Sequence, residues 1–453
     1  MTDALIIHPF DNVEVRADGH KYARRAIAAG ENIIKYGMPI GHATRAIAKG
    51  EHVHVDNVKT NLGEVLEYRY EPSFTDVTRV PPPTIRAYRH PDGRVGIRND
   101  LWVVPLVGCV NRLAERLAAS CGGLALTHPY GCSQMGEDHE RTANMLAQFC
   151  HHPNAGGVLV VALGCENNTL ESFKVRLGDY SRLNIRFLRA QDPGDEYAKG
   201  LALLKELEAA RPKDRVEVSA SELVVGLKCG GSDGFSGLTA NPLVGRFSDW
   251  LAARGGSTIL TEVPEMFGAE TLLMKRCRTR DVFDKCVRMI NDFKDYYASH
   301  HQVCYENPSP GNKAGGITTL EDKSLGCVQK GGSAPVEDVL LYGESVKKHG
   351  LSLLTGPGND LVASTVLAAA GCHLVLFTTG RGTPFGCVVP TLKVATNDTL
   401  AANKPNWIDW NAMSDPDVEA FAQKVLAVAS GEKAKNELNG AQGIAIFKDG
   451  VTL

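Results

Sequence analysis

The chain has 453 residues, and its 49 lysines and arginines nearly balance its 52 aspartates and glutamates, for a formal net charge of −3. This balance argues against a general nucleic-acid binder, which usually carries a strongly basic face or tail. No apolar run approaches the roughly 20 residues that span a bilayer, and the first ten residues lack the features of a signal peptide. We therefore expect a cytoplasmic protein with no nucleic-acid or membrane partner, whose twelve cysteines are mostly free thiols or ligands.

The first 60 residues contain an internal repeat. The segment 19–31 is echoed by 41–51, and each copy is followed by a β-favouring stretch, at 32–36 and 52–56. Short units that end in Gly-Glu before a strand are typical of small β-rich modules with tight turns. The repeat therefore predicts a small, pseudo-symmetric β-rich domain.

Histidines of this module form a candidate metal site. On a strand over 52–56, the side chains of His52, His54 and Asp56 would project from one face, because side chains alternate along a strand. Two imidazoles and a carboxylate can bind a divalent first-row metal, and His20 could complete the set if the repeat folds back on itself. The alternative is an edge strand with solvated histidines.

The rest of the chain predicts an α/β body. Residues 64–90 read as a linker, in which three consecutive prolines favour extended backbone. Beyond it, short apolar runs alternate with helical patterns, as in α/β sheets with a parallel component. We expect an α/β domain over 91–220 and a second over 221–453, with parallel-sheet (Rossmann-like) character in both. Expected strands are 101–107, 157–163, 223–227, 257–260 and 373–377, and expected helices are 110–119, 140–149 and 415–430.

Half of the cysteines follow a glycine, several of them at the predicted end of a strand: Cys109, Cys132, Cys165, Cys327, Cys372 and Cys387. In open α/β sheets, ligands bind beyond the carboxyl ends of the strands, so we expect some of these cysteines at a shared site. The alternative is small apolar side chains that fill tight turns. No Cys-x-x-Cys pair occurs, which excludes a zinc ribbon, whereas an iron–sulfur cluster on three dispersed cysteines stays open.

Three glycine-rich segments, 127–139, 228–242 and 306–319, carry many polar groups. Such loops can hold an anionic or polyhydroxylated ligand through backbone N–H groups, although turn chemistry alone also explains them. None is a Walker A loop or a convincing dinucleotide fingerprint, so we expect no nucleotide cofactor. Glu262 follows the predicted strand 257–260 and is a candidate base or ligand.

Several motifs together resemble one enzyme family over almost the whole chain. The sequence is similar to the altronate and galactarate dehydratases, whose family also includes sulfolactate sulfo-lyase. The segments that carry the resemblance are 19–21, 34–37, 52–54, 92–99, 130–134, 163–168, 229–234, 261–270, 307–327 and 379–384.

The resemblance implies a hydro-lyase that removes water from a sugar acid to give a 2-keto-3-deoxy acid. For D-altronate the product would be 2-keto-3-deoxy-D-gluconate. It also implies a divalent metal, Fe2+ with Mn2+ as the alternative, and an N-terminal SAF or β-clip module over residues 1–63. A lyase for galactarate, another aldonate or a sulfonated hydroxy acid is the alternative function, followed by a non-catalytic sugar-acid-binding relative. A homo-oligomer is left open.

This chemistry assigns roles to particular residues. A base removes the α-proton, a metal stabilises the enediolate, and an acid assists loss of the β-hydroxide. We expect metal ligation by His20, His52, His54 and Asp56, with Cys132 and Cys165 as a rival pair. The candidate bases or acids are Lys313, Glu262 and His128. The expected substrate contacts are Arg98, Asn167, Ser232, Asp233, Asn312 and Arg381, with the arginines holding the carboxylate.

Two features depart from the family pattern. Residues 15–18 join the opening strand directly to the Gly-His-Lys motif, where altronate dehydratases carry a longer segment of about one hairpin. Asp56 stands where the family usually has a third histidine. The first difference bears on substrate specificity and the second on metal preference, because aspartate can also ligate a metal.

Overall fold

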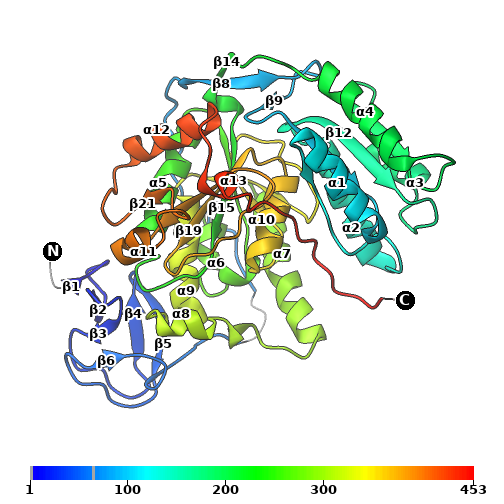
Figure 1. The fold of residues 1–453 in the computed structure, drawn as a ribbon. Coiled ribbons are helices and arrows are strands. Elements are labelled where there is room, and N and C mark those ends of the chain that lie inside the picture. Colours follow the sequence, from blue (N-terminus) through cyan, green and yellow to red (C-terminus); the bar gives the residue numbers. More distant parts are fainter. Residues whose placement is uncertain (1–3, 64–66, 453) are drawn as a thin grey trace.

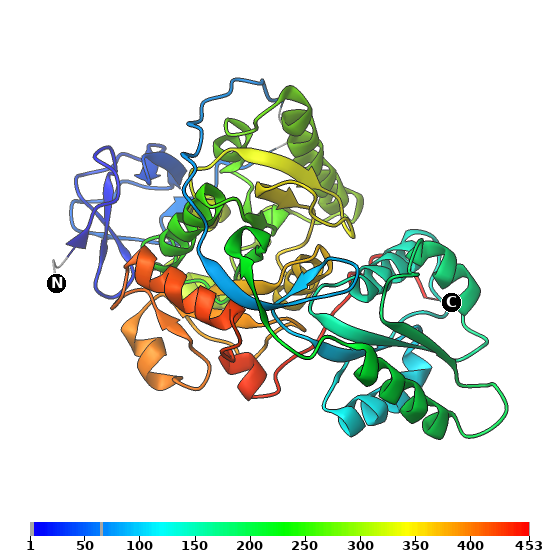
Figure 2. The same ribbon diagram turned by 90° about the horizontal axis from the view of Figure 1, so that it is seen from above.

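The structure, a computed structural model, describes residues 4–63 and 67–452. A small β-rich module at the N-terminus lies against a large α/β region, and a second, smaller α/β region lies on the other side (Figures 1 and 2). Within the described ranges, no helix is both long and apolar enough to cross a membrane.

The N-terminal module consists of two small sheets, ordered β1-β2-β3-β6 and β4-β5-β7. The internal repeat gives it pseudo-symmetry. Ile27 and Ile47 face each other in a β-bridge, and each copy closes with an equivalent ion pair, Arg25 with Glu31 and Arg45 with Glu51. The predicted β-rich module is confirmed, with strands β1 (Ala4–Leu5), β2 (Val13–Arg16), β3 (Lys21–Ala23), β4 (Asn32–Lys35), β5 (Met38–Ala43), β6 (His52–Val53) and β7 (Val58–Lys59).

The predicted strand over 52–56 is wrong, because β6 ends at Val53 and the chain turns over residues 54–57. Asn57 forms this turn by accepting a hydrogen bond from the His54 N–H and donating one to the His52 carbonyl. Asp56 consequently lies at the exposed tip of the turn, 3.5 Å from Arg45.

The expected linker is partly a strand. Residues 67–83 contain no helix or strand, and their backbone lies on the large α/β region through hydrogen bonds such as Ser73 N to the Lys275 carbonyl. Residues 84–89 form β8, which pairs with β14 (Val216–Ser219) and β9 (Val95–Gly96). In Figure 2 this small sheet lies at the junction of the two α/β regions.

The smaller α/β region is built on a four-stranded sheet, ordered β11-β10-β12-β13, in which every pairing is parallel. Its strands are β10 (Asp100–Pro105), β11 (Leu124–Ala125), β12 (Ala155–Ala162) and β13 (Ile185–Arg189). Its helices are α1 (Asn111–Cys121), α2 (Gly136–Cys150), α3 (Leu170–Leu177) and α4 (Glu196–Ala210).

The larger region has a seven-stranded parallel sheet, ordered β17-β18-β16-β15-β19-β20-β21. The strands are β15 (Val224–Cys229), β16 (Ser257–Leu260), β17 (Val336–Leu340), β18 (Gly350–Leu354), β19 (Leu374–Thr379), β20 (Thr391–Ala395) and β21 (Trp410–Asn411). The helices are α5 (Ala240–Ala253), α6 (Glu270–Met274), α7 (Arg280–Ser299), α8 (Pro310–Ala314), α9 (Leu320–Cys327), α10 (Asp360–Ala369), α11 (Asp398–Asn403), α12 (Val418–Ala429) and α13 (Lys435–Leu438). The predicted α/β body is confirmed, and its Rossmann-like character stays a prediction.

Two features of this arrangement position the site. The strand order runs outward in both directions from β15 and β19, so the topological switch point lies between them. The last residues of the chain then return to the smaller α/β region (Figure 1), where the Asp449 and Gly450 N–H groups donate to the Asp138 carboxylate.

Candidate functional site

A cavity of about 560 Å³ opens at the carboxyl ends of the central strands. Cys229 ends β15 and lines the cavity together with the loops that follow β16 and β18. This is the position at which open parallel sheets bind their ligands. The lining combines apolar and aromatic side chains with a group of polar and charged ones, Glu265, Asn307, Ser309, Asn312, Lys323 and Asp360.

A buried ion pair faces this cavity. The Lys323 ammonium lies 2.7 Å from the Glu265 carboxylate and 3.1 Å from the Asn307 side-chain oxygen. Burial alone would raise the pKa of Glu265, but the ammonium groups of Lys323, Lys228 and Lys330 outweigh it and lower the pKa to about 2. Burial alone would lower the pKa of Lys323, but the Glu265 carboxylate outweighs it and raises the pKa. Both groups are therefore charged at neutral pH.

Glu262 does not line the cavity but is hydrogen-bonded to Cys229, which does. Its backbone is left-handed, with φ of 72°, directly after the strand β16, a conformation that a non-glycine residue adopts only where its surroundings impose it. The carboxylate accepts a hydrogen bond from the Cys229 N–H at 3.1 Å and pairs with Lys228 and with Lys330, 3.1 Å away. Glu262 does not line the cavity and its carboxylate is taken up by these partners, so it holds the loop rather than reaching a substrate.

Two cysteines meet in the same cluster. The Cys229 and Cys327 sulfurs lie 3.2 Å apart, and each is within 3.3 Å of the same Glu265 oxygen. The Lys330 ammonium lies 2.9 Å from the Cys229 sulfur. Of the six cysteines that follow a glycine, only Cys327 lies in this cluster. The other five belong neither to the cluster nor to the lining of the cavity.

The N-terminal module brings three histidines together. His20 Nδ1 and His52 Nε2 are 3.1 Å apart, and the His54 ring is stacked on the His52 ring with a centroid distance of 5.1 Å. Burial, reinforced by Lys21 and the two neighbouring histidines, lowers the pKa of His54 to about 4. His54 is therefore neutral at physiological pH, which is the form that ligates metals.

The module is anchored to the large region by a buried charge cluster. The Asp322 carboxylate on α9 accepts Lys21 at 2.7 Å and Lys35 at 2.9 Å. In Figure 1, α8 and α9 lie beside the module. A Cβ at Gly234 would lie only 1.8 Å from the Gly19 carbonyl oxygen, so one glycine of the 228–242 segment is required by this close approach.

Two groups of side chains are close enough to hold a metal ion among the residues that the structure describes: His20, His52 and His54, and Cys229, Glu265 and Cys327. The histidine group fits such an ion, because the buried Nδ1 of His54 has no hydrogen-bond partner and neutral imidazole suits divalent iron. The cysteine group fits poorly. Two thiolates on one tetrahedral ion lie about 3.8 Å apart, given metal–sulfur bonds of about 2.3 Å. Here the two sulfurs are only 3.2 Å apart, and the Lys330 ammonium already lies 2.9 Å from the Cys229 sulfur.

Comparison with known families accounts for three successive segments of the chain. Residues 11–61 match the altronate/galactarate dehydratase SAF domain, and residues 87–210 match the second domain of D-galactarate dehydratase/altronate hydrolase. Residues 220–452 match the C-terminal domain of D-galactarate/altronate dehydratase. The chain belongs to the altronate/galactarate dehydratase family.

Individual family members are similar over nearly their full length. The altronate dehydratase of Bacillus subtilis (strain 168) is 54% identical over 470 residues, covering 98% of this chain and 94% of the relative. The altronate dehydratase of Escherichia coli (strain K12) is 52% identical, covering 96% of this chain and 92% of the relative. The galactarate dehydratase (L-threo-forming) of Escherichia coli (strain K12) is 32% identical, covering 93% and 87%.

Arg98 lies in a buried network of ion pairs and hydrogen bonds, and its expected contact with substrate stays a prediction. Its guanidinium forms a bidentate ion pair with Glu437 at 2.7 and 2.8 Å and donates to the Val428 and Glu432 carbonyls. With an exposed fraction of 3% and its donors engaged, Arg98 ties β9 to the C-terminal helices.

His128 is likewise buried and hydrogen-bonded, and its expected role as base or acid stays a prediction. Its Nε2 donates to the Pro105 carbonyl at 2.8 Å, and its Nδ1 accepts from the Tyr130 N–H at 3.2 Å. Burial lowers the pKa of His128 to about 4. Both nitrogens are occupied, so the ring supports the 127–139 loop.

The candidate residues of the smaller α/β region, Asn167, Cys132 and Cys165, do not line the cavity. Asn167 accepts a hydrogen bond from the Ser133 N–H and lines a shallow surface depression next to α2. Cys132 and Cys165 are exposed, and neither belongs to a ligand group within residues 4–63 and 67–452. The structure therefore gives no support to them as rival metal ligands.

Of the remaining substrate candidates, only Asn312 lines the cavity. Asn312 lines it and donates to the Ser232 carbonyl at 2.9 Å, while the Ser232 hydroxyl is buried with no partner. The Asp233 carboxylate accepts from Thr396, among other donors, and so shapes its own loop. Arg381 donates to the Gly311 carbonyl and lines a different cavity, between the module and the large region.

Lys313 directly follows Asn312, which lines the cavity, but Lys313 itself does not line it. It lies in the last turn of α8 and is half-buried. Asp56 is not part of the group formed by His20, His52 and His54 and pairs with Arg45 instead, so its place in the ligand set stays a prediction.

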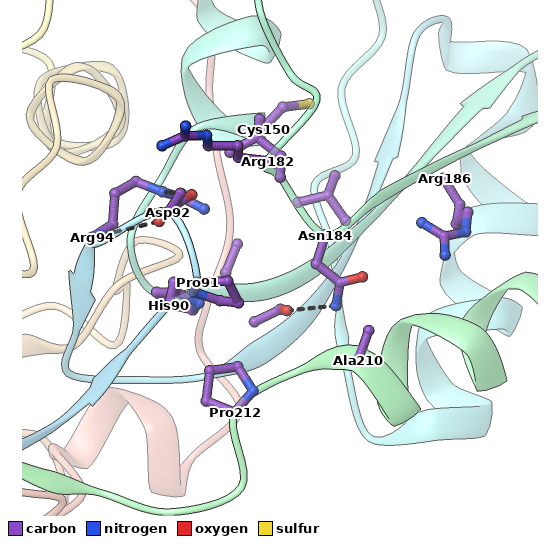
Figure 3. Close-up of a pocket in the computed structure, with 14 residues that line it drawn as sticks. His90, Pro91, Asp92, Arg94, Cys150, Arg182, Asn184, Arg186, Ala210 and Pro212 are labelled. Carbon is purple, nitrogen blue, oxygen red and sulfur yellow. Dashed lines mark hydrogen bonds and ion pairs between the residues drawn. The ribbon is translucent and has the colours of Figure 1, made fainter.

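A further pocket lies where the β8–β9 hairpin meets the smaller α/β region (Figure 3). Its charged groups are largely paired with one another or with backbone. Arg94 pairs with Asp92 at 2.6 Å and donates to the His151 carbonyl, and Asn184 donates to the Gly156 carbonyl. The Asp92-Gly93-Arg94 motif of the family thus secures the junction of two regions.

Sequence reasoning missed the groups that face the cavity. Glu265 and Cys229 were visible inside family motifs but received no role, and Lys323 and Lys330 received none either. Lys323 lies on α9, a helix rich in polar residues that the structure buries along its whole length. Burial of that kind is not visible in a single sequence.

Proposed function

We propose that this chain dehydrates D-altronate to 2-keto-3-deoxy-D-gluconate. The observation that carries the proposal is the Glu265–Lys323 pair, which faces a polar cavity at the switch point of a parallel sheet. The two altronate dehydratases at 54% and 52% identity support this substrate over galactarate, whose dehydratase is 32% identical.

In this proposal Glu265 removes the proton from C2 of the sugar acid. The carboxylate is unprotonated at neutral pH, but its low pKa makes it a weak base while Lys323 is paired with it. A substrate carboxylate that binds the Lys323 ammonium would weaken that pairing and make Glu265 more basic. Lys323 then stabilises the negative charge that develops on the enediolate.

The C3 hydroxide needs a proton as it leaves. Tyr296 and Tyr297 line the far wall of the cavity, and burial raises the pKa of each hydroxyl. Either phenol therefore holds its proton at neutral pH and can protonate the leaving hydroxide. The resulting enol becomes the 2-keto acid by tautomerisation.

We propose that His20, His52 and His54 hold a divalent ion, Fe2+ in preference to Mn2+. When bound, such an ion supplies Lewis-acid stabilisation of oxyanions. The support is the donor set and the unpartnered His54 Nδ1. We also propose a cytoplasmic location, consistent with twelve cysteines that are all unbridged, and we assign no oligomeric state.

The test is keto-acid release from D-altronate and from galactarate under anaerobic conditions, with Fe2+ added after chelation. We expect turnover of altronate well above that of galactarate, and a fall in kcat of about 10²–10⁴-fold in Glu265→Gln. Glu419→Gln, a surface glutamate that binds Trp250, is the matched control and should retain activity. Full activity in Glu265→Gln would refute the assignment of the base, and preference for galactarate would refute the substrate.

A further inference from the structure

Cys229 and Cys327 form the closest cysteine contact that the structure describes near the cavity, with their sulfurs 3.2 Å apart. The two residues come from different elements, the end of β15 and the end of α9, separated by 98 positions in the chain. Both are almost fully buried, with exposed fractions of 1% and 3%. Only Cys229 lines the cavity and can be reached by a small molecule that enters it.

The two sulfurs differ in their hydrogen-bond partners, because only Cys229 contacts a lysine ammonium. The Lys330 ammonium, 2.9 Å from the Cys229 sulfur, is placed to stabilise a thiolate there. Both sulfurs contact the same Glu265 oxygen, Cys229 at 3.3 Å and Cys327 at 3.1 Å, so the lysine contact is what distinguishes Cys229. The hydrogen bond with Cys229, together with burial, raises the pKa of Cys327, so this thiol keeps its proton.

We propose that Cys229 and Cys327 are a peroxide-reactive pair that closes reversibly to a disulfide at the wall of the cavity. Cys229 is the attacking sulfur, because it faces the cavity and has the lysine. Cys327 is the resolving sulfur, because it is already within van der Waals contact of its partner.

The oxidation balances with a hydroperoxide as the oxidant. The Cys229 thiolate attacks one peroxide oxygen, the O–O bond breaks, and the departing oxygen leaves as an alcohol or as water after taking a proton. Cys229 is then a sulfenic acid. The Cys327 sulfur attacks the Cys229 sulfur, the S–S bond forms, and the hydroxide that leaves takes the Cys327 proton as water. Two electrons pass from the thiols to the peroxide.

Disulfide formation would disturb the Glu265–Lys323 pair. An S–S bond of about 2.05 Å requires the sulfurs to approach by more than 1 Å, and Glu265 loses the S–H group that lies 3.1 Å from its oxygen. Lys330 also loses the free Cys229 sulfur as a hydrogen-bond partner and keeps only Glu262, 3.1 Å away. We therefore expect oxidation to stop turnover, a consequence that rests on the proposed function, whereas the disulfide itself does not.

A second buried pair provides the control. Cys277 and Cys286 are also hydrogen-bonded to each other, with exposed fractions of 0%. Neither lines the cavity of Cys229. If proximity and burial alone decided reactivity, both pairs would oxidise alike.

The experiment treats the reduced full-length protein with hydrogen peroxide, blocks free thiols, and maps peptides without reduction. We expect a peptide that links Cys229 to Cys327, removed by dithiothreitol, with Cys277 and Cys286 still alkylated. In Cys327→Ser, dimedone should label Cys229, and reductant should no longer restore the starting state after prolonged peroxide treatment. Lack of the linked peptide, or equal oxidation of the control pair, would overturn the proposal.

Metal analysis completes the test. A stoichiometric metal that is lost in Cys229→Ser but kept in His54→Ala would also overturn the proposal, because it would make the cysteines ligands. Loss of activity without the linked peptide would count against the pair, and a linked peptide in a protein with no altronate turnover would leave the pair intact and refute the proposed function instead.

Discussion

Replacing Asp322 with asparagine should detach the N-terminal module from the rest of the protein. Asp322 is the only carboxylate that the described contacts give to Lys21 and Lys35, and all three side chains are at most 3% exposed. The asparagine keeps the shape and can still accept from the Thr318 N–H, but it leaves two buried ammonium groups without a counter-charge. Breaking a buried pair in this way costs about 3–5 kcal/mol.

The loss should appear as local opening of the module rather than as global unfolding. Hydrogen exchange of the module amides, for example those in β2 and β5, should speed up by roughly 10²–10⁴-fold, which is the same free energy expressed as a population of the open state. Asp76→Asn is the control. Asp76 pairs with Arg278 at 2.8 Å but is 74% exposed, so its loss should cost at most about 1 kcal/mol.

Two further measurements make this prediction easy to refute. Adding Lys21→Met and Lys35→Met to the asparagine variant should recover most of the stability, because apolar replacements of a buried ionic group are often neutral. Burial alone would raise the pKa of Asp322, but Lys21 and Lys35 outweigh it and hold the pKa well below the ordinary value. The stabilisation is therefore full above about pH 4 and is lost only as the pH falls further. An asparagine variant no weaker than the Asp76 control would disprove the anchoring role.

Three other predictions test the assignments at single residues. His54→Ala should lower bound iron, measured by elemental analysis, to a small fraction of its stoichiometry, and unchanged iron would exclude the histidine site. Arg98→Met leaves Glu437 buried without its partner and should cost about 3–5 kcal/mol in urea unfolding while the folded fraction keeps its KM; a raised KM with unchanged stability would restore a substrate contact. Because burial lowers the pKa of His128 to about 4, the unfolded state binds the extra proton between about pH 6.5 and pH 4, and stability falls by up to about 3 kcal/mol as the pH drops through that window. His128→Gln should flatten the measured pH dependence of unfolding there, and an unaltered slope would contradict a buried neutral imidazole.

The elements with strong local signals were predictable from the sequence. The strand expected at 257–260 matches β16, and the helix expected at 110–119 differs from α1 by at most two residues at each end. The repeat predicted the module, since each copy carries its own turn glycine and its own Arg–Glu pair. The strand over 52–56 failed because the Asn57 side chain hydrogen-bonds the backbone and turns the chain, a local competition that β-propensity ignores.

The candidate site was only half predictable for a related reason. His20 lies in the first copy of the repeat, and His52 and His54 directly follow the second. The two copies pair with each other in the module, which brings the three histidines together. Arg98, His128 and Asp233 are polar residues in glycine-rich motifs, but hydrogen bonds join their side chains to other groups of the protein, Arg98 to Glu437 on α13, His128 to backbone and Asp233 to its own loop and Thr396. Nothing in one sequence separates a polar group that shapes a loop from one that faces a ligand.

The sequence by itself determined that this chain has a β-rich N-terminal module, an α/β body and the motifs of one dehydratase family, because these depend on local periodicity and on fixed residue spacing. Only the tertiary structure decided which charges meet. Glu265 and Lys323 are 58 positions apart, and Cys229 and Cys327 are 98 apart. They come together because parallel strands place their carboxyl ends at one edge of the sheet, and because the buried helix α9 carries Lys323 and Cys327 to that edge while Asp322 on the same helix anchors the module.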